Sequence, residues 1–362
     1  MSQTHQDLYL EPAKPLAEHE LPRLSIIILN WNGRHHLDGC FESLGAADYP
    51  REKLDVICVD NGSDDGSQAH LKAKHAWVRL IQNPRNLGFA GGCNVGVANA
   101  DQPDILVFLN NDLRIEPDFF RNLVAPIVRG QVQAAGGLMY AWDGKTVDSA
   151  GGGMNFHGFG IQYGLRKPFG PEFERPRWTL FACGGAMAMD AKVYADLGGF
   201  DNRFFAYYED VDLGWRSWVQ GYQTCYVPSA LLPPPVEHSR RVPPERLRLL
   251  QVRNPMLACL KNYDEANSRG SSRRCWPGHA PLVPGEWTWR RRWRLPHREH
   301  AGSAQGRSLA GTARQAAQGP RPPPTDRPHR RRRPVRDQRR DRRLEPLDGR
   351  ALRAAGPPQT LR

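Results

Sequence analysis

Four short apolar runs, each followed by polar residues, dominate the first 112 residues. They are residues 24–29, 55–59, 78–81 and 106–109. Short runs rich in β-branched side chains are typical of strands that are buried on both faces of a parallel sheet. Segments of helical length separate the runs, and residues 37–44 carry apolar side chains at the helical spacing. The pattern therefore predicts a mostly parallel, doubly wound α/β sheet with a functional site along one edge.

The second half of the sequence has a weaker pattern. Residues 131–180 are rich in glycine and aromatic residues with little periodicity, which predicts loops and short strands on a smaller, acceptor-side region. Residues 207–219 predict a helix that opens on three acids, because Val211 and Trp215 share an apolar face and Gly221 supplies a stop. Acids in the first turn of a helix are stabilised by its dipole.

The composition changes abruptly near the end of the chain. From Arg269 onward there are 24 arginines, no lysine and 7 acidic residues, so this segment carries about +17 and the rest of the chain about −5. No Tyr or Phe follows Tyr263. Such a segment buries too little apolar surface to fold, so residues 266–362 are predicted to be a disordered, low-complexity basic tail. Translation out of frame would leave the same composition, and resequencing the coding DNA would test that alternative.

These shifts divide the chain into three parts. Residues 1–22 are polar with three prolines and are predicted to be a flexible leader. One domain is expected over residues 23–265, with a nucleotide-binding half at 23–112 and an acceptor half at 113–265. The basic tail follows this domain.

Cysteine usage and the absence of long apolar stretches indicate a compartment. The seven cysteines are scattered without a Cys-x-x-Cys pair, which favours buried free thiols in a reducing environment. The N-terminus has no apolar core of a secretion signal, and no window approaches the ~20 apolar residues that span a bilayer. We therefore expect a cytoplasmic protein, with a peripheral contact to the inner face of the cell membrane as an open alternative.

Two of the predicted strands end on carboxylates. The fourth strand runs into Asn110-Asn111-Asp112, and ligands of open α/β sheets bind at the carboxyl edge of the strands. We hypothesise that Asp112 holds a divalent cation against a nucleotide diphosphate; the alternative is that it only caps the next helix. Asp60 ends the second strand, where its carboxylate can accept the N3–H of uracil or thymine or form the turn before Asn61-Gly62. The two roles of Asp60 are compatible.

A series of motifs in fixed order carries a family resemblance over about residues 23–263. Together the motifs resemble the family 2 glycosyltransferases of GT-A fold and, within them, the bacterial rhamnosyltransferase-like group. The resemblance implies an inverting transfer from a nucleoside diphosphate sugar. The matching segments are residues 25–33 (SIIILNWNG), 59–66 (VDNGSDDG), 86–96 (NLGFAGGCNVG), 106–112 (LVFLNND), 184–200 (GGAMAMDAKVYADLGGF), 204–215 (FFAYYEDVDLGW) and 253–261 (RNPMLACLK).

The resemblance implies a metal site for Mg²⁺ or Mn²⁺. Asp112 matches the last acid of the family's Asp-x-Asp motif, which is the direct ligand of the cation that neutralises the departing diphosphate. Asn110 replaces the first acid of that motif, so the electrostatics of the site are weaker here. The family often places a histidine near the metal, and His238 stands at a matching distance along the chain. The alternative for His238 is an inert, exposed histidine.

The resemblance also implies a nucleotide pocket. Asp60 matches the base-recognition residue, which favours a UDP-sugar or a dTDP-sugar over purine donors. The Gly-rich loop is not a dinucleotide fingerprint, because its glycines have the wrong spacing and it follows the third strand. Turn formation is the alternative role for the asparagines of the pocket. The other expected nucleotide-binding residues are Asn30, Asn32, Asn86, Gly88, Asn94 and Asn111.

For the chemical step, an inverting transfer needs one base to take the proton of the acceptor hydroxyl. Asp210 and Glu209 match the family's Glu-Asp pair, with Asp210 as the expected base and Glu209 as an aid to the acceptor. Capping of a helix is the alternative role of both acids. Asp212 should pair with Arg216 four residues later, so residues 210–212 are not the metal motif.

The sequence therefore predicts an inverting, metal-dependent glycosyltransferase. It would move a sugar, with rhamnose as the first candidate, to a cell-surface glycan or a lipid-linked precursor. Two alternatives remain: a catalytically weak or dead sugar-nucleotide-binding protein whose tail binds anionic partners, and a sugar-phosphate nucleotidyltransferase. The second would show a Gly-rich phosphate loop where residues 30–33 stand. No specific nucleic acid partner is expected, since the tail lacks Phe and Tyr for base stacking.

Overall fold

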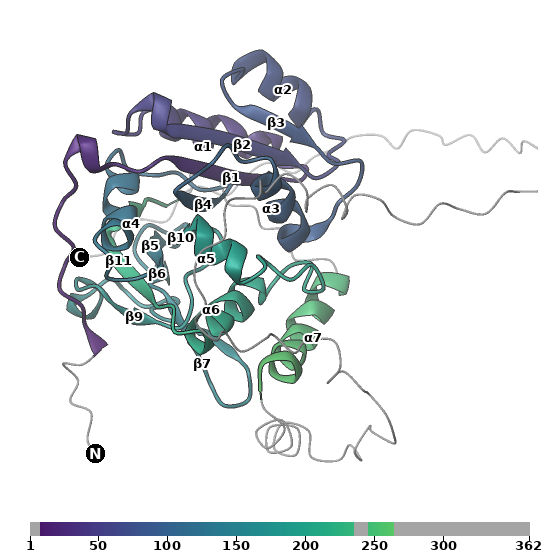
Figure 1. Ribbon diagram of the computed structural model, residues 1–362. Helices are drawn as coiled ribbons and strands as arrows, with labels where there is room; N and C mark the ends of the chain where they lie inside the picture. The colour runs from purple at the N-terminus through teal and green to yellow at the C-terminus, as the bar shows by residue number, and fades with distance from the viewer. Residues whose placement is uncertain (1–7, 235–244, 264–362) are drawn as a thin grey trace, which may run out of the picture. The chain divides into compact units, whose positions relative to one another are not determined.

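The computed structural model describes residues 8–234 and 245–263, which form an α/β fold around one mixed sheet (Figure 1). Within these residues, eight strands follow one another across the sheet in the order β3-β2-β1-β4-β10-β5-β11-β9, and β6 pairs with β5. The strands are β1 (Leu24–Asn30), β2 (Leu54–Asp60), β3 (Arg79–Gln82), β4 (Ile105–Asn110), β5 (Ala134–Tyr140), β6 (Val147–Ser149), β9 (Arg177–Thr179), β10 (Ala186–Asp190) and β11 (Thr224–Leu232), with β7 (Gly152–Met154) and β8 (Gly160–Gln162) as a separate pair.

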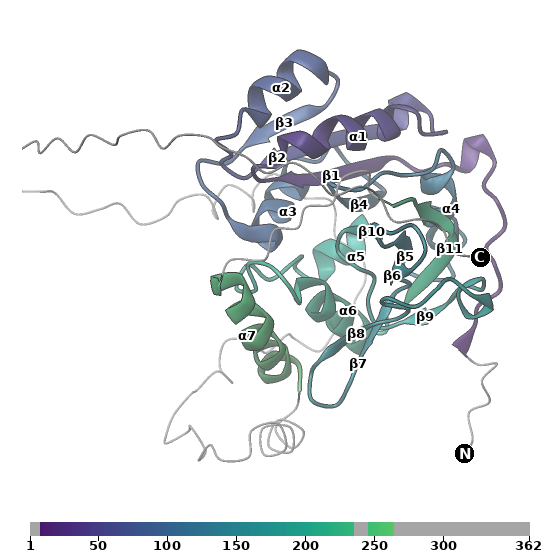
Figure 2. The ribbon, with the colours of Figure 1, turned by 180° about the vertical axis from the view of Figure 1, so that it is seen from behind.

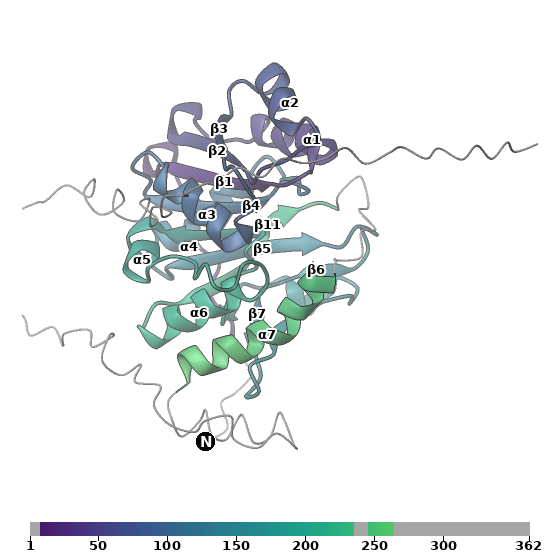
Figure 3. The same cartoon turned by 90° about the vertical axis from the view of Figure 1, so that its right-hand side faces the viewer.

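Helices connect the strands and cover both faces of the sheet. The α-helices are α1 (Arg34–Gly45), α2 (Ser67–Lys74), α3 (Gly88–Ala98), α4 (Phe119–Val128), α5 (Ala191–Asp196), α6 (Glu209–Val219) and α7 (Glu245–Asn262). Short 3₁₀ turns lie at Glu18–Glu20, Arg51–Lys53 and Pro171–Phe173. Figure 3 shows α6 and α7 side by side at the end of the sheet away from β3.

The first half of the sheet is parallel, as predicted. β1 lies between β2 and β4 and pairs in parallel with both, and β3 extends β2 in the same direction. The register aligns Asn30 with Asp60 across β1 and β2, and Leu29 with Asn110 across β1 and β4. The polar ends of the three strands therefore reach the same edge at the same level.

Each face of this half has its own apolar core, which explains the continuous apolar runs. Ile26 and Ile28 of β1 belong to the cluster that packs α1 and α4 on one face. Ile27 points the other way, into the cluster that contains residues of α3, α5 and α6. A strand buried on both faces cannot alternate apolar with polar residues. Figures 1 and 2 show the two helical layers from opposite sides.

The second half of the sheet is mixed, and here one expectation is corrected. Residues 131–180 were expected to hold loops and short strands. The three-residue strands β6 to β9 confirm this, but β5 is a buried central strand that pairs with both β10 and β11. Its sequence is Ala-Ala-Gly-Gly-Leu-Met-Tyr, because neighbouring atoms approach too closely for larger side chains. A Cβ at Gly136 would lie 2.8 Å from Ala182 Cβ, and one at Gly137 would lie 2.5 Å from the Ala230 carbonyl oxygen.

The packed structure also starts earlier than the predicted domain. Leu16 and Leu21 belong to the flexible leader of the prediction, but both side chains are buried in the main core. Glu20 pairs with Arg129, which follows α4. The sequence pattern missed this packing because an irregular segment has no apolar periodicity.

Two further expectations concern membranes and the tail. None of the helices between residues 8 and 263 that the structure describes is long and apolar enough to cross a membrane. The predicted basic tail, residues 266–362, lies outside the described residues.

Candidate active site

A chain of side-chain hydrogen bonds joins the carboxyl ends of β4, β1 and β2. Asn111 Nδ2 donates to Asn30 Oδ1 at 2.7 Å, and Asn30 Nδ2 donates to Asp60 Oδ1 at 3.0 Å. Asn30 Nδ2 also donates to Ser63 Oγ at 3.2 Å. Three of the residues expected at the nucleotide therefore lie together: Asn30, Asp60 and Asn111.

Asp60 is fully buried and both of its carboxylate oxygens are hydrogen-bonded. Besides Asn30, the carboxylate accepts from the Ser63 backbone N–H at 3.0 Å and from Gln68 Nε2 at 2.8 Å. The Ser63 bond closes the turn that follows β2, so the turn-forming role of Asp60 is present. Gln68 is half-exposed, in contrast to the fully buried Asp60.

Asn61 holds the Gly-rich loop that leads into α3. Its Nδ2 donates to the Gly88 carbonyl at 2.9 Å and to Asn86 Oδ1 at 3.2 Å, while its Oδ1 accepts from Asn83 Nδ2 at 2.9 Å. Gly88 has φ +77°, and a Cβ there would lie 2.3 Å from the Phe205 carbonyl oxygen. The sequence identified Asn61 only as a turn residue, because its partners lie 22 to 27 positions away.

Asn32 and Asn94 lie in different places. Asn32 adopts φ 52° and its Oδ1 accepts from the Asp64 backbone N–H at 2.9 Å, beside a cavity of about 630 Å³. Asn94 lies within α3, where its Oδ1 accepts from the Tyr194 hydroxyl at 2.7 Å and its Nδ2 donates to the Phe200 carbonyl at 2.7 Å. Asn94 therefore connects α3 to the segment before α6 and does not join the hydrogen-bond chain of Asn30.

Asp112 follows β4 and is exposed. Its carboxylate makes no hydrogen bond or salt bridge with any residue that the structure describes. It does not cap the next helix, because α4 begins at Phe119 with Asp118 in the N-cap position. Burial, and then the charge of Asp112, raise the pKa of Asp148 on β6, so a second carboxylate lies within electrostatic range of Asp112. His238, the other expected metal ligand, lies outside the described residues.

Glu209 and Asp210 open α6 and lie close to the end of β4. Asp210 Oδ2 accepts from the Gly184 backbone N–H at 3.0 Å, and Oδ1 accepts from the Val211 N–H at 2.8 Å. The next residue of that turn, Gly185, accepts at its carbonyl from the Asn110 N–H at 2.9 Å. The Gly184-Gly185 turn thus links Asp210 to the strand that carries the predicted metal motif.

The two acids at the start of α6 differ in their surroundings. Glu209 is buried, and its Oε2 finds no hydrogen-bond partner within the described part of the chain. Burial, and then the charge of Asp210, raise the pKa of Glu209 well above its ordinary value. Burial also raises the pKa of Asp210, but three backbone N–H groups, those of Gly184, Val211 and Asp210 itself, oppose the shift. The pair therefore favours a neutral Glu209 beside an ionised Asp210.

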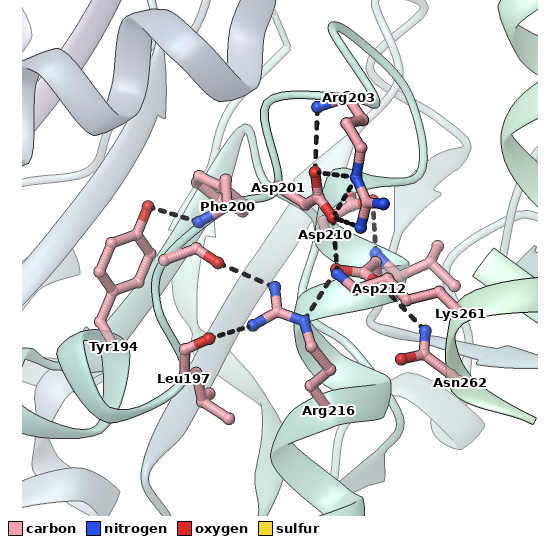
Figure 4. A network of polar contacts seen from close by, with 12 residues as sticks. Tyr194, Leu197, Phe200, Asp201, Arg203, Asp210, Asp212, Arg216, Lys261 and Asn262 are labelled. Atoms are coloured by element: carbon pink, nitrogen blue, oxygen red, sulfur yellow. Dashed lines mark hydrogen bonds and ion pairs between the residues drawn. The ribbon is translucent and has the colours of Figure 1, made fainter. Parts of the chain in front are cut away.

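Asp212 belongs to a structural network, as the sequence predicted (Figure 4). Its fully buried carboxylate accepts from Arg216 Nε at 2.8 Å, from Lys261 Nζ at 2.8 Å and from Asn262 Nδ2 at 2.9 Å. Lys261 also pairs with Asp201 at 2.9 Å. These contacts fasten α6 to α7 and to the loop before α6, so Asp212 has no free oxygen to offer a ligand.

Comparison with known proteins gives this site a family. Residues 25–198 match the family described as Glycosyl transferase family 2. The chain contains a family 2 glycosyltransferase domain. The match covers the strands that carry Asp60 and Asp112 and the turn that binds Asp210, while Glu209 and Asp210 follow it. The protein is therefore a glycosyltransferase, and the nucleotidyltransferase alternative loses its support.

Individual relatives of this glycosyltransferase are distant. The chain is 28% identical over 233 residues to the N-acetylglucosaminyl-diphospho-decaprenol L-rhamnosyltransferase of Mycobacterium tuberculosis. This match covers 57% of this chain and 74% of that protein. It is 32% identical over 212 residues to the O-antigen biosynthesis protein RfbC of Myxococcus xanthus, covering 55% of this chain and 16% of that protein.

A solved structure supports the GT-A fold of the glycosyltransferase. The structure of GalNAc-T7 with UDP, GalNAc and Mn²⁺ superposes with a TM-score of 0.51 at 18% identity and covers 62% of this chain. This chain spans less than half of that protein, 45% of its length. The likeness concerns the fold of the shared domain.

A strained loop precedes the acids of the glycosyltransferase domain. Three non-glycine residues, Phe205, Tyr207 and Tyr208, have φ between 66° and 72°. Such left-handed residues cost about 1–3 kcal/mol each and persist only where the surroundings hold them. Asn254 of α7 supplies that support: its buried Nδ2 donates to the carbonyls of Phe204, Ala206 and Tyr207 at 3.0, 2.9 and 2.6 Å.

Proposed function

We propose that this glycosyltransferase is inverting and metal-dependent, and that it transfers a sugar from a UDP- or dTDP-sugar to a glycan or a lipid-linked saccharide. The link from Asp210 through Gly184 and Gly185 to β4 carries the proposal. It sets the expected base beside the strand end that carries Asp112. Asp60 lies at the same edge of the sheet, through Asn30 and Asn111.

We propose that Asp60 recognises the pyrimidine base. A uracil or thymine N3–H can replace the Gln68 amide, since Gln68 is half-exposed and its loss would open one side of the carboxylate. The Ser63 N–H and the Asn30 amide keep the carboxylate oriented. By the resemblance of Asp60 to the family's base-recognition residue, we expect the pocket to favour pyrimidine donors over purine donors.

The donor set near Asp112 suits a hard cation. The residues there offer an unengaged carboxylate from Asp112 and a second carboxylate from Asp148, and Mg²⁺ and Mn²⁺ prefer oxygen ligands. Bound there, the cation would neutralise the diphosphate leaving group. Asp148 is a carboxylate that the local sequence pattern did not reveal. It partly compensates for Asn110, where the family pattern has an acid.

In the proposed reaction Asp210 acts as the base. The acceptor hydroxyl oxygen forms a bond to the anomeric carbon, and its proton passes to the Asp210 carboxylate. The bond between the anomeric carbon and the diphosphate oxygen breaks, and the nucleoside diphosphate leaves with the electron pair. One displacement of this kind inverts the anomeric configuration. Glu209 stays neutral beside Asp210, so it can donate a hydrogen bond to the acceptor.

The nature of the sugar and the acceptor comes from a relative. The mycobacterial protein is named as a rhamnosyltransferase acting on an N-acetylglucosaminyl-diphospho-decaprenol. We infer that a deoxyhexose such as rhamnose and a polyprenyl-linked acceptor are the first candidates for this chain. An acceptor of that kind would bring the enzyme to a membrane surface.

A donor screen tests the proposed function. The purified chain should transfer or slowly hydrolyse UDP- or dTDP-sugars with Mg²⁺ or Mn²⁺, and should leave GDP-sugars unchanged. Asp60→Asn should lower kcat/KM for the pyrimidine donor by about 10- to 100-fold, because one hydrogen bond to a charged group contributes about 1.5–3 kcal/mol. Turnover of GDP-sugars at the same rate would contradict the base assignment. Absence of turnover with every donor would favour the sugar-nucleotide-binding alternative.

A second test concerns Asn254. Asn254→Ala removes the donor that supports the loop in which Phe205, Tyr207 and Tyr208 are left-handed, so the Asp210 carboxylate should lose its position. We expect kcat to fall by about 10- to 100-fold, since a misplacement of about 1 Å can cost 10²-fold, with little change in nucleotide affinity. Hydrogen exchange in residues 204–208 should become faster. Gln251→Ala, at an exposed position of α7, is the matched control. Faster exchange with an unchanged kcat would show that the loop does not position the base.

A further inference from the structure

Two histidines converge on one carboxylate between α1 and α2. His70 Nε2 and His75 Nε2 lie 2.7 and 2.8 Å from Asp38 Oδ1. The three candidate ligand atoms all lie within 4.8 Å of one another. The side chains of His75, His70 and Asp38 are 5%, 19% and 37% exposed. Figures 1 and 2 show α1 and α2 next to each other near the β3 end of the sheet.

A simple ion pair does not require this arrangement. Asp38 already has a permanent cationic partner, because Lys74 Nζ lies 2.7 Å from Asp38 Oδ2. Both imidazoles nevertheless direct the same ring nitrogen at the remaining oxygen. Two imidazole nitrogens and one carboxylate oxygen are the protein ligands of many zinc sites, including catalytic ones with two histidines and an acid.

We propose that Asp38, His70 and His75 bind a zinc-like divalent transition metal ion, at a site separate from the cation of the sugar donor. Ligands about 2.0–2.1 Å from a tetrahedral ion lie about 3.3 Å apart, so each imidazole would retreat from Asp38 by about half an ångström. The adjoining cavity of about 630 Å³, which Asp38 and His70 help to line, has room for a fourth ligand. The inference does not depend on the proposed reaction.

The chemistry of the cluster supports an ionised, pre-oriented donor set. The Lys74 ammonium, whose Nζ lies 2.7 Å from Asp38 Oδ2, favours the ionised carboxylate. Lys74 can stay on Oδ2 while Oδ1 faces the metal, as an outer partner of a ligand carboxylate. Each neutral imidazole would carry its proton on Nδ1 and direct the Nε2 lone pair at the ion.

The metal would restrain the loops that follow the ends of β1 and β2. Asp38 lies on α1, whereas His70 and His75 lie on α2 and at its C-terminal cap. The loops at the starts of these helices are already connected, since the Arg34 N–H donates to Asp65 Oδ2 at 2.9 Å. A metal between the helices would therefore restrain the loops that follow Asn30 and Asp60. We infer a structural role for this metal.

Metal binding by the full, untagged chain is the direct test. After dialysis against EDTA, the protein should take up one Zn²⁺ per chain and keep it through gel filtration. Its melting temperature should rise with Zn²⁺, and Co²⁺ should give the strong visible absorption of a tetrahedral site. Loss of an outer partner of a metal ligand lowers affinity by about 10- to 100-fold. Asp38→Asn and His70→Ala each remove a ligand, so each should weaken Zn²⁺ binding by more than this. His19→Gln, which removes an exposed histidine elsewhere, should leave binding unchanged.

A third variant separates a metal site from an ion-pair network. Lys74→Met removes the outer partner of the ligand carboxylate, so in the proposed site it should weaken Zn²⁺ binding by about 10- to 100-fold, less than the loss of a ligand does. In a plain ion-pair network the same change would only lower stability, with no metal bound. Failure of the wild-type chain to retain Zn²⁺ would overturn the proposal. So would stoichiometric Zn²⁺ that persists in both Asp38→Asn and His70→Ala. Donor turnover is not a readout here, so these outcomes are independent of the proposed function.

Discussion

Asp210→Asn should lower kcat for sugar transfer by about 10²- to 10⁴-fold, the usual contribution of a positioned general base. The substitution keeps the size of the side chain. The amide oxygen of asparagine can still accept the hydrogen bond from the Gly184 N–H. It removes the lone pair that accepts the proton of the acceptor hydroxyl. Nucleotide affinity, measured by calorimetry, should change little. The substitution leaves Asp60, the proposed partner of the nucleobase, and Asp112, the proposed cation ligand, unchanged.

The pH profile gives an independent check on Asp210. A base must be deprotonated to act, and burial raises the pKa of Asp210 above its ordinary value of 3.8. The rate of the wild-type enzyme should therefore fall on acidification at a higher pH than an exposed aspartate would give. That acidic limb should disappear in the residual activity of Asp210→Asn. Glu209→Gln is the matched control. Because Glu209 is expected to be neutral, this substitution should lower kcat less than Asp210→Asn does. An equal loss of kcat would assign the role of general base to Glu209.

Asp112→Asn should lower kcat/KM by about 100-fold or more at ordinary cation concentrations. A metal that polarises a departing phosphate contributes several kcal/mol to the transition state, and each 1.36 kcal/mol is tenfold in rate. Asn110 leaves Asp112 as the one acid of its motif, so its loss removes the carboxylate that the cation depends on most. The measurement is turnover as a function of Mn²⁺ and Mg²⁺ concentration. Raised cation concentrations should restore part of the activity.

The neighbouring positions supply the controls for Asp112. Asp118→Asn removes another exposed carboxylate from the same connection and should leave the cation dependence unchanged. Asn110→Asp restores a second acid and should lower the cation concentration needed for half-maximal turnover. Asp148→Asn should raise it, if the carboxylate on β6 helps to hold the ion. Equal cation dependence in the wild type and in Asp112→Asn would assign the metal to other residues.

Local patterns were sufficient for the parallel half of the fold. The strands at 24–30 and 54–60 are each buried by different helices on their two faces, so their sequences are continuous apolar runs. The same reasoning failed for β5, whose glycines and alanines fit a close approach to Ala182 and Ala230. A strand selected for small volume has no apolar periodicity, and only its neighbours explain its composition.

The candidate site divides in the same way. The sequence predicted roles for Asp60 and Asp112 from their positions at strand ends, and for Asp210 from the family resemblance. It could not identify Asn254, which lies on α7 and supports the loop before Asp210 from 47 to 50 positions away. Nor could it pair His70 and His75 with Asp38, which lies 32 and 37 positions earlier.

The sequence by itself determined the strands and helices of the parallel half and the chemical groups that stand at the ends of those strands. The tertiary structure decided which of these groups touch: Asn111 with Asn30, Asn30 with Asp60, Gly184 with Asp210, and the two histidines with Asp38. Periodicity reports how one segment meets the core, which is a local property. Contacts between segments depend on strand order, register and packing distance, and these are fixed only when the whole sheet and its helices come together.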